Sequence, residues 1–549
     1  MRSIPAPDAR IRYTVRPAPS LEHPVTESAS QSVAVGEFST AQDASRSANA
    51  DVDWFIFTTS AVIILGVCVP LAMFPDSGKA FLDAGFRYVT QDLGVLYVLG
   101  ASFALGVLLW LALGRYGAVR LGPADSRPDF STPSWIAMLF CGGIGSSVVY
   151  WGTIEWAYYF TAPPFGATPS GGEALLWATA YPLFHWGFTG WALYCLPAVA
   201  IAYAYHVREA GTLRLSAACA PAHPALGRGL PGRLIDLTFM VGLIGATSTG
   251  LGLSVPLISA SLNNMFGVAE SFGVSLGIIV VISALFATSV YVGLDRGIKR
   301  LSNVNVGLAV GLVLLVFITG PTVFIAETGV EAVGHVLQNY LRMSSYTDAQ
   351  QTTDFVGAWT VFYWAWWLAL GPFMGIFITK ISRGRTIKEL VLCSLGYGSL
   401  GCALFFIVLG NYALYVEQNG IVPVLELLDT KGAPHAIVAV LGALPFGGLA
   451  LPMFVVLCVI FAATSYDSAS YTLASAATRD LDPDAHPPGW HRMFWAFFLS
   501  ILPITLIYLG GLRSLQSAMV IISVPLLVVM VLLAIGLMRG LREQAPTNG

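Results

Sequence analysis

The stretch FVGAWTVFYWAWWLALGPFMGIFITK occupies residues 355–380 and has no charged side chain before its final lysine. About 20 apolar residues in helical form are enough to cross the hydrocarbon core of a bilayer. Four tryptophans, at positions 359, 364, 366 and 367, are followed by the pair Gly371-Pro372. Because proline lacks a backbone donor and disturbs hydrogen bonding in a helix interior, we predict a membrane helix that is interrupted at this pair.

Apolar runs of similar length recur along the whole chain. Hydrophobic residues make up 56% of the 549 residues and charged residues 11%, against about 25% charge in soluble domains. The pattern predicts an all-α polytopic membrane protein with about twelve transmembrane helices. We place these helices near 53–74, 90–113, 133–160, 180–205, 233–262, 274–294, 303–326, 355–380, 387–416, 446–478, 490–509 and 514–538.

Lys and Arg are distributed unevenly between the predicted helices. The even-numbered connections hold most of them, whereas the third and fifth connections hold none. Cytoplasmic loops carry an excess of positive charge, so we expect the even connections and both termini to be cytoplasmic and the chain to be a multi-pass protein of the cell inner membrane. The basic residues of the second, fourth, sixth and eighth connections are Arg115, Arg120, Arg127, Arg208, Arg214, Arg228, Arg233, Arg296, Lys299, Arg300, Lys380, Arg383, Arg385 and Lys388, whereas the seventh has only Arg342 and the ninth only Lys431.

Polar segments accompany the predicted helices. The first 52 residues are rich in Ala, Ser and Pro and have no apolar signal-peptide core, so we expect a disordered cytoplasmic tail. Residues 330–343 are too short to span and predict an amphipathic helix on the outer face. The expected organisation is a tail at 1–52, two leading helices in 53–132, a first five-helix repeat with the outer helix in 133–340, a second five-helix repeat in 355–538, and a short cytoplasmic tail at 539–549.

The third helix carries Cys141-Gly-Gly-Ile-Gly-Ser-Ser147 near its middle. This interruption and the one at Gly371-Pro372 each fall in the first helix of a five-helix set. Backbone groups freed inside a membrane are tolerated only where protein or a water-filled cavity satisfies them. Interrupted helices at matching places in two halves indicate a transporter built from inverted repeats. Helices that flex only for packing are the alternative.

Aromatic residues of the fourth and eighth helices predict a binding site. Trp366 and Trp367 lie about 12 Å along the helix from Trp359, too deep for the interfacial belt that holds most membrane tryptophans. Electron-rich rings around a dry pocket suit a cation that cannot donate hydrogen bonds, with about 2 kcal/mol for each desolvated cation–π contact. Aromatic core packing is the alternative. The fourth helix adds Trp186, Trp191 and Tyr194.

These residues resemble the signature of the betaine/carnitine/choline transporter family. The resemblance covers helices three to ten and implies a secondary transporter with alternating access, a LeuT-like five-plus-five inverted repeat and a homotrimer. Tyr150-Trp-Gly and Pro163-Pro-Phe-Gly are nearer to the family's carnitine/butyrobetaine exchangers than to its glycine-betaine symporters. The motifs are Trp359 to Arg385, Gly143-Ile-Gly145, Tyr150-Trp-Gly-Thr-Ile-Glu155, His185-Trp186, Gly293-Leu-Asp-Arg-Gly-Ile-Lys-Arg-Leu-Ser-Asn and Thr464-Ser-Tyr-Asp-Ser468.

Carried over residue by residue, the family's aromatic box implies substrate-binding roles for six positions. Two neighbouring positions depart from the family pattern: Leu370 stands where an aromatic residue is usual, and Ser147 where a third glycine is common. These departures leave betaine, carnitine, choline and sulfonium analogues open as substrates. The six residues are Tyr150, Trp186, Trp191, Tyr194, Trp366 and Trp367.

The resemblance also implies a sodium site. Thr464 and Ser465 match hydroxyl ligands of the family's sodium symporters, and the backbone carbonyls of Cys141 and Ile144 in the broken third helix would complete the set. Asn305 stands where sodium-independent exchangers of the family have an arginine. We therefore favour sodium-coupled symport, with sodium-independent exchange as the alternative. A competing interpretation is that both hydroxyls bond back to carbonyls of their own helix.

Other function classes find less support. The net charge of −3 offers no basic patch for nucleic acid, the seven scattered cysteines have no metal-ligand spacing, and the eight histidines form no catalytic constellation. We expect no enzyme and no cofactor besides the sodium ion, and keep a polytopic membrane enzyme and a channel as rivals from other classes. We also expect Glu155 to be solvated near the outer end of its helix, Asp467 to make an inter-helix bond, and His185 to be a core hydrogen-bond partner.

Overall fold

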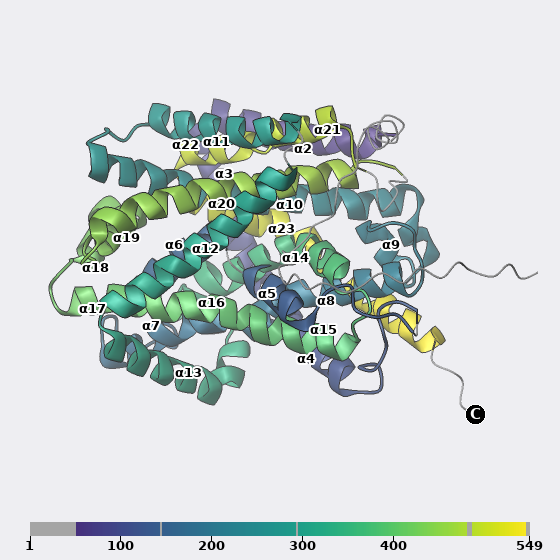
Figure 1. The fold of residues 1–549 in the computed structure, drawn as a ribbon, viewed down its shortest axis with the longest axis horizontal. Coiled ribbons are helices and arrows are strands. Elements are labelled where there is room, and N and C mark those ends of the chain that lie inside the picture. The colour runs from purple at the N-terminus through teal and green to yellow at the C-terminus, as the bar shows by residue number, and fades with distance from the viewer. Residues whose placement is uncertain (1–50, 124, 143–144, 293–294, 480–485, 545–549) are drawn as a thin grey trace, which may run out of the picture. The chain divides into compact units, whose positions relative to one another are not determined.

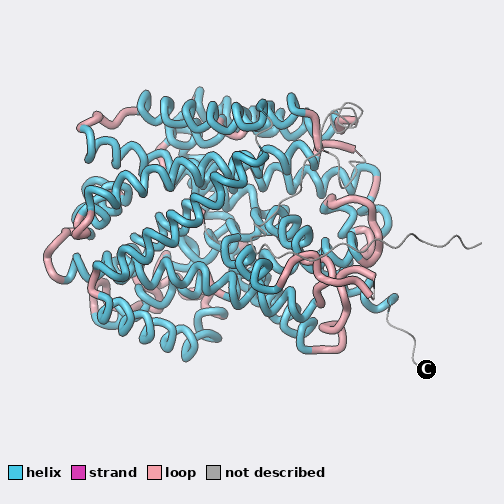
Figure 2. The backbone as a smooth tube through the Cα atoms, viewed as in Figure 1, coloured by secondary structure: helices cyan, strands magenta, loops and turns pink. Residues whose placement is uncertain are grey.

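The computed structural model describes residues 51–123, 125–142, 145–292, 295–479 and 486–544 (Figure 1). In these ranges the backbone is helical or irregular, and the two β-bridges found there are isolated pairs rather than strands (Figure 2). The all-α class is therefore confirmed.

The predicted membrane helices all have counterparts. Ten helices in the described ranges are long and apolar enough to cross a membrane, and the bent pair α5 and α6 forms one further span. The predicted sixth helix corresponds to α11. The elements that correspond to the predicted helices are α2 (Trp54–Met73), α4 (Gly94–Leu113), α5 (Thr132–Gly142) with α6 (Ser146–Thr161), α7 (Gly172–His185) with α8 (Phe188–His206), α10 (Gly229–Phe266), α11 (Phe272–Val292), α12 (Asp295–Thr319), η3 (Val356–Val361) with α14 (Phe362–Ile381), α15 (Ile387–Cys393) to α17 (Asn411–Gln418), α20 (Gly447–Ala476), α21 (Gly489–Phe498) with α22 (Ile501–Leu509), and α23 (Leu512–Gln544).

Several shorter helices lie between the spans. The ninth span contains two π-helical turns, η4 (Ser394–Gly398) and η5 (Phe406–Gly410), around α16 (Ser399–Phe405). These local widenings were not expected from the sequence. The remaining short elements are α3 (Pro75–Arg87), η1 (Tyr88–Asp92), α9 (Leu215–Cys219), η2 (Pro224–Gly227), α18 (Val424–Lys431) and α19 (Ala433–Gly442).

The third predicted helix is broken where its glycines lie. α5 ends at Gly142, α6 begins at Ser146, and the two helices are bent by 55° relative to each other. Gly143 and Ile144 lie outside the described residues. The first N–H groups of α6 have no helical partner, so a break here provides free backbone groups at membrane depth. The predicted interruption of helix three is confirmed.

The eighth predicted helix is not broken at Gly371-Pro372. α14 runs without interruption from Phe362 to Ile381 and contains Pro372. Gly371 instead lets α14 approach α8, because a Cβ there would lie 2.6 Å from the carbonyl oxygen of Leu193. The prediction was wrong because this glycine serves helix packing. The irregular turn lies earlier, in the π-helical η3, and the division of the chain into two five-helix repeats stays a prediction.

The outer amphipathic helix is longer than predicted. α13 spans Thr322–Ser344, and α12 accordingly ends at Thr319, several residues before the predicted end of the seventh span. α13 packs against α7 and buries residues such as Ala332, whereas Val330 and Leu341 on its other side are 74% and 83% exposed. The two-sided character expected for residues 330–343 therefore extends over a helix of 23 residues.

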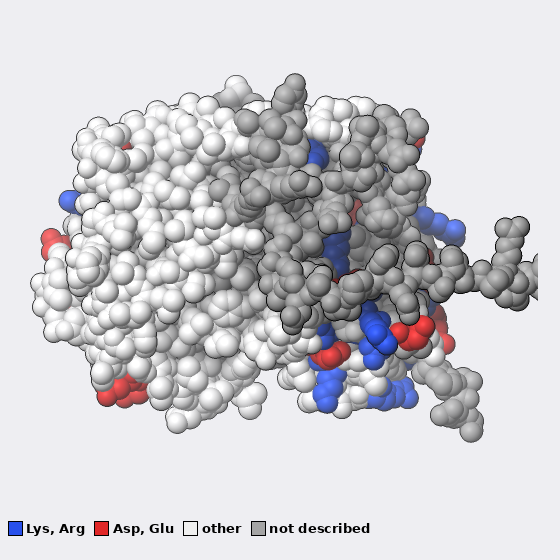
Figure 3. Space-filling model, viewed as in Figure 1, with Lys and Arg blue, Asp and Glu red and all other residues white. Residues whose placement is uncertain are grey.

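Of the even-numbered connections, the second contacts the eighth, and the fourth contacts both described ends of the chain. These contacts agree with the alternation of basic residues, which predicts one side for all even connections. On the face drawn in Figure 3, most Lys and Arg side chains gather towards the end where α9 and the C-terminus lie. Three contacts define the group: Arg120 Nη1 donates to the oxygen of Gly384 at 2.6 Å, Arg214 lies 3.9 Å from the Asp53 carboxylate, and Arg208 lies 2.7 Å from Glu543.

The odd-numbered connections form a second group. The backbone N–H of Phe165 in the third connection donates to the hydroxyl of Tyr346 in the seventh at 3.2 Å. Glu270 in the fifth connection lies 2.6 Å from His435 near the ninth. Contacts that join even connections to even and odd to odd are what a chain crossing the membrane at each span requires.

Candidate substrate-binding site

α8 and α14 pack closely along their lengths, and five of the six expected binding residues meet at this contact. We name these five the aromatic cluster. Trp367 is its centre, since the ring centroids of Tyr194, Trp186 and Trp191 lie 4.4, 5.6 and 6.0 Å from it. Trp366 joins through Trp186 at 5.9 Å. All five side chains are more than nine-tenths buried: Trp186, Trp191, Tyr194, Trp366 and Trp367.

Two glycines make room for the rings of the cluster. A Cβ at Gly190 would lie 2.7 Å from Cε2 of Trp367, and a Cβ at Gly398 would lie 2.4 Å from Cδ2 of Trp191. Carbon atoms do not approach this closely, because side chains are already in van der Waals contact at about 3.5–4.0 Å. The positions of the two tryptophans therefore depend on glycines in the fourth and ninth spans.

Trp186 lies at a break in the fourth span. α7 ends at His185 and α8 begins at Phe188, whereas the sequence predicted one continuous helix. In a regular helix Trp186 and Trp191 would point about 140° apart, and the break brings both into contact with Trp367. Two residues flank the break: Pro182 lies within α7, and a Cβ at Gly187 would lie 2.4 Å from the oxygen of Leu183.

Tyr150, the sixth expected residue, lies one layer away from the cluster. Its buried ring on α6 contacts Trp151 at a centroid distance of 4.9 Å. Trp151 lies 6.1 Å from Tyr363, which lies 5.6 Å from Trp186. Through the ring contacts of the described residues, Tyr150 is thus linked to the cluster by two intervening rings.

Glu155 adds a buried carboxylate beside the cluster. It is 0% exposed, so the expectation of a solvated residue was wrong. Its Oε2 accepts hydrogen bonds from Trp186 Nε1 at 3.1 Å and from the Tyr363 hydroxyl at 2.5 Å. Its Oε1 accepts one from the Tyr159 hydroxyl at 2.6 Å. The break that places Trp186 also brings the α7–α8 junction against α6, and no local sequence pattern reveals this.

His185 is the core hydrogen-bond partner that we expected. Its Nδ1 lies 2.9 Å from the Tyr159 hydroxyl and its Nε2 lies 3.1 Å from Oγ1 of Thr360. The imidazole is fully buried and Nδ1 lies 3.8 Å from Oε1 of Glu155. The ring therefore belongs to the polar shell around Glu155.

Three of the four expected sodium ligands lie in the described part of the chain. Thr464 is half-buried on α20, and its Oγ1 donates to the oxygens of Ile460 at 2.9 Å and Phe461 at 3.3 Å. This is the back-bonding that competes with ion coordination. Ser465 is exposed and Cys141, near the end of α5, is half-buried, while Ile144 lies outside the described residues.

Two polar residues near the proposed ion site have different environments. Asp467 Oδ1 lies 3.6 Å from Arg492 Nη2, so the expected bond between helices, here α20 and α21, is confirmed. Asn305 on α12 is 1% exposed, and its Oδ1 has no hydrogen-bond partner among the described residues.

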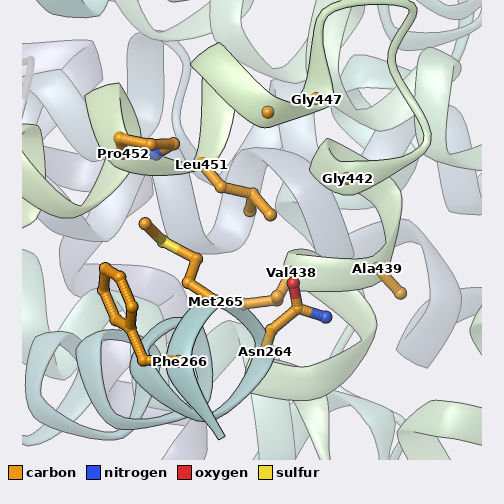
Figure 4. A pocket seen from close by; sticks show the side chains of 10 residues that line it. Asn264, Met265, Phe266, Val438, Ala439, Gly442, Gly447, Leu451 and Pro452 are labelled. Carbon is orange, nitrogen blue, oxygen red and sulfur yellow. The ribbon is translucent and has the colours of Figure 1, made fainter.

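A cavity of about 560 Å³ lies elsewhere in the molecule (Figure 4). It is formed by the end of α10, by α19 and by the start of α20, and Figure 4 shows Met265, Phe266 and Leu451 around it. Asn264 is its one lining residue with a polar side chain. None of its lining residues belongs to the aromatic cluster, so it is not the site built by α8 and α14.

Comparison with known proteins gives a consistent family. The family model described as "BCCT, betaine/carnitine/choline family transporter" matches residues 55–546. The transporter YeaV of Escherichia coli, named as uncharacterized, is 35% identical over 80% of this chain and 91% of its own length. A carnitine transporter of Acinetobacter baumannii is 33% identical over 89% of each chain. A glycine betaine transporter of Acinetobacter baylyi is 32% identical over 91% of this chain and 74% of its own.

Among solved structures, one similar chain is a Na⁺-coupled sialic acid symporter in a substrate-bound outward-open state. The alignment covers 77% of this chain and 79% of that one, with 15% identity and a TM-score of 0.36. We base no inference on a likeness at this level.

Proposed function

The chain belongs to the betaine/carnitine/choline family of transporters, and on this premise we propose that it carries a small quaternary-ammonium zwitterion or cation by alternating access. The family membership that its motifs suggested is confirmed, and with it a polytopic transporter rather than an enzyme. Relatives named as carnitine and glycine betaine transporters support the substrate class.

The observation that carries this proposal is the aromatic cluster. A quaternary ammonium group cannot donate hydrogen bonds, and electron-rich ring faces within about 6 Å attract it most strongly where water is excluded. The cluster offers four indoles and one phenol at a buried helix contact. Because its rings touch one another at centroid distances of 4.4–6.0 Å, the substrate would enter by separating Trp367 from its neighbours. We assign substrate binding to the five cluster residues, with Tyr150 in the layer behind them.

Sodium-coupled symport is the coupling mode that we propose. The ligands would be the hydroxyls of Thr464 and Ser465 and the backbone carbonyls of Cys141 and Ile144. The confirmed break between α5 and α6 supports it because unwound backbone supplies the oxygen ligands that such ions need. The uncharged, buried Asn305 supports it too, since no fixed cation occupies that position. Sodium binding would require the Thr464 hydroxyl to release its helix carbonyls.

Sodium-independent exchange is the second candidate within the family. The observation that favours it is the structure's own arrangement of α20, in which Thr464 bonds back to Ile460 and Ser465 is exposed. A transporter of this kind would bind substrate equally well in sodium and potassium buffers.

The environment of the protein follows from the same proposal. We place it in the cell inner membrane with both termini and the even connections in the cytoplasm, because the group of contacting connections is also the basic one. We also propose that the N-terminal tail is disordered, that the protein forms a homotrimer and that the lipid bilayer is its partner.

The test is transport by the purified full-length protein in liposomes. Labelled glycine betaine, carnitine and choline are offered with an inward sodium gradient, with potassium alone, and with unlabelled substrate trapped inside. We expect uptake of at least one compound that depends on the sodium gradient. Uptake driven only by trapped substrate would establish exchange, and no uptake of any quaternary-ammonium compound would refute the proposed function.

A further inference from the structure

Glu155 is a fully buried ionisable side chain with three donors aimed at it. The donors are the hydroxyls of Tyr159 and Tyr363 and the indole N–H of Trp186. A lone carboxylate inside a membrane protein is costly and marks a functional position by default. The family resemblance gives it no role, and the expected substrate and ion ligands do not include it.

The hydrogen-bond pattern fits an ionised carboxylate. An ionised carboxylate only accepts hydrogen bonds, and an indole N–H only donates them. Trp186 and Tyr363 both donate to Oε2, and Tyr159 donates to Oε1. Hydrogen bonds to the charged form favour that form, so these three donors stabilise the negative charge.

The neighbouring His185 does not have to cancel this charge. The one hydroxyl proton of Tyr159 is directed at Glu155, so its oxygen is free to accept from Nδ1 of His185 at 2.9 Å. The other ring nitrogen, Nε2, lies 3.1 Å from Oγ1 of Thr360, a hydroxyl that can donate to it. A neutral imidazole with its proton on Nδ1 therefore satisfies every bond in the network, which then keeps a net negative charge.

This charge is joined directly to a ring of the aromatic cluster. The indole N–H of Trp186 donates to Oε2 of Glu155, while the same indole lies 5.6 Å from Trp367 and 5.9 Å from Trp366. A charged acceptor polarises the donor that it binds, and hydrogen bonds in low-dielectric interiors strengthen one another. Electron density pushed into the indole strengthens the quadrupole that attracts a cation to its face.

We propose that Glu155 is the residue that makes the site prefer a cationic head group over a neutral one of the same shape. Its negative charge polarises Trp186 through the indole N–H and makes the face of that ring more attractive to a cation. It is a positioning residue, because it acts through Trp186 rather than through contact with the substrate. The inference rests on the proposed function, since it concerns how the aromatic cluster selects its ligand.

A second carboxylate–indole pair in the same protein provides a matched control. Glu173 Oε1 accepts from Trp177 Nε1 at 3.2 Å, and the two residues are four apart on α7. Trp177 contacts Phe165 and His335, which lie outside the aromatic cluster. Glu173→Gln therefore removes a carboxylate from a bond to an indole at a place where no cluster ring is affected, although Glu173 is exposed and Glu155 is buried.

The experiment compares two ligands on the purified full-length protein by calorimetry. One is glycine betaine, carnitine or choline, whichever binds the wild type most tightly. The other is its isostere with tert-butyl in place of trimethylammonium. We expect the wild type to prefer the cation at least tenfold and Glu155→Gln to lower that ratio at least fivefold, through the affinity for the cation. Glu173→Gln should leave the ratio unchanged, and Glu155→Asp should retain most of it.

The outcomes separate the inference from the proposed function. If no quaternary-ammonium compound binds the wild type, the proposed function fails and the inference with it. If the wild type shows the preference but Glu155→Gln weakens both ligands equally, Glu155 is only structural and the inference alone is overturned. Should Glu155→Gln not fold, Tyr363→Phe removes one hydroxyl and keeps the charge. The ratio must not fall in that variant, and a fivefold fall would assign the preference to the hydrogen-bond network instead of the charge.

Discussion

The aromatic cluster between α8 and α14 and the hydroxyl pair on α20 differ in how their residues are held. Trp367 has rings on three sides and a glycine, Gly190, against its edge. Thr464 bonds to carbonyls of its own helix and Ser465 is exposed. The first region is held by close packing between two helices, whereas the Thr464 hydroxyl in the second is held by carbonyls of its own helix. The comparison shows that contacts between helices fix the rings of the aromatic cluster, whereas contacts within one helix fix the Thr464 hydroxyl.

Loss of the Trp367 ring should have the largest effect on ligand binding. Trp367→Leu keeps apolar volume but removes the face shared with three neighbours, so the binding constant for the preferred quaternary-ammonium ligand should weaken at least tenfold and up to about a hundredfold, roughly 1.4–2.8 kcal/mol. Calorimetric titration measures it. Trp495→Leu is the control, because that buried ring contacts Phe57 and Phe498 rather than the cluster. Equal weakening in both variants would contradict a specific role for the cluster.

A larger side chain at the contact between α8 and α14 should have the next largest effect. Gly371→Ala places a Cβ 2.6 Å from a backbone oxygen of α8, and overpacking of this kind costs about 1–3 kcal/mol. The thermal unfolding midpoint should fall and ligand affinity should fall with it. Helix propensity alone would favour alanine by about 1 kcal/mol, so a decrease is diagnostic. Gly106→Ala on α4 is the control, since its Cβ would meet nothing within 4 Å.

The hydroxyl pair should show an effect that depends on sodium. If Thr464 and Ser465 are ligands, sodium should tighten substrate binding about fivefold, and substrate should tighten sodium binding by the same factor. Replacing both by alanine should abolish this coupling and leave the binding measured in potassium buffer. Thr472→Ala is the control, because that hydroxyl donates to the oxygen of Ser468 in the same helix. Binding of equal strength in sodium and potassium for the wild type would contradict the ion site.

The smallest effect is expected at Asp467, which lies inside a predicted membrane helix as Glu155 does. Asp467 has Arg492 at 3.6 Å and both side chains are partly exposed, so Asp467→Asn should lower the unfolding free energy by at most about 1 kcal/mol and leave substrate affinity unchanged. Unfolding in denaturant and ligand titration measure the two quantities. A loss of substrate affinity with unchanged stability would contradict the structural role and bring Asp467 into the transport site.

Helix positions could be predicted because they depend on local sequence, and five of the six residues that the family resemblance implied meet in the aromatic cluster. Hydropathy over some 20 residues reports on burial in lipid wherever a helix packs, and the tryptophans around Trp366 and Trp367 stand out by their depth. The prediction of a break at Gly371-Pro372 failed because the sequence does not distinguish a glycine that breaks a helix from one that lets a neighbouring helix approach. The prediction of a solvated Glu155 failed because exposure depends on which neighbours cover the residue.

The sequence by itself determined an all-α membrane protein, the order of its spans, the grouping of its connections into two sides and the family to which it belongs. Tertiary structure alone decided that Trp186 leaves the helix so that it can meet Trp367, that Gly190 and Gly398 make room for the rings, and that Glu155 is enclosed by Tyr159, Tyr363 and Trp186. The physical reason is that the hydrophobic effect is non-directional and can be read residue by residue. Close contacts and buried hydrogen bonds, in contrast, depend on the distances between atoms that the sequence keeps far apart.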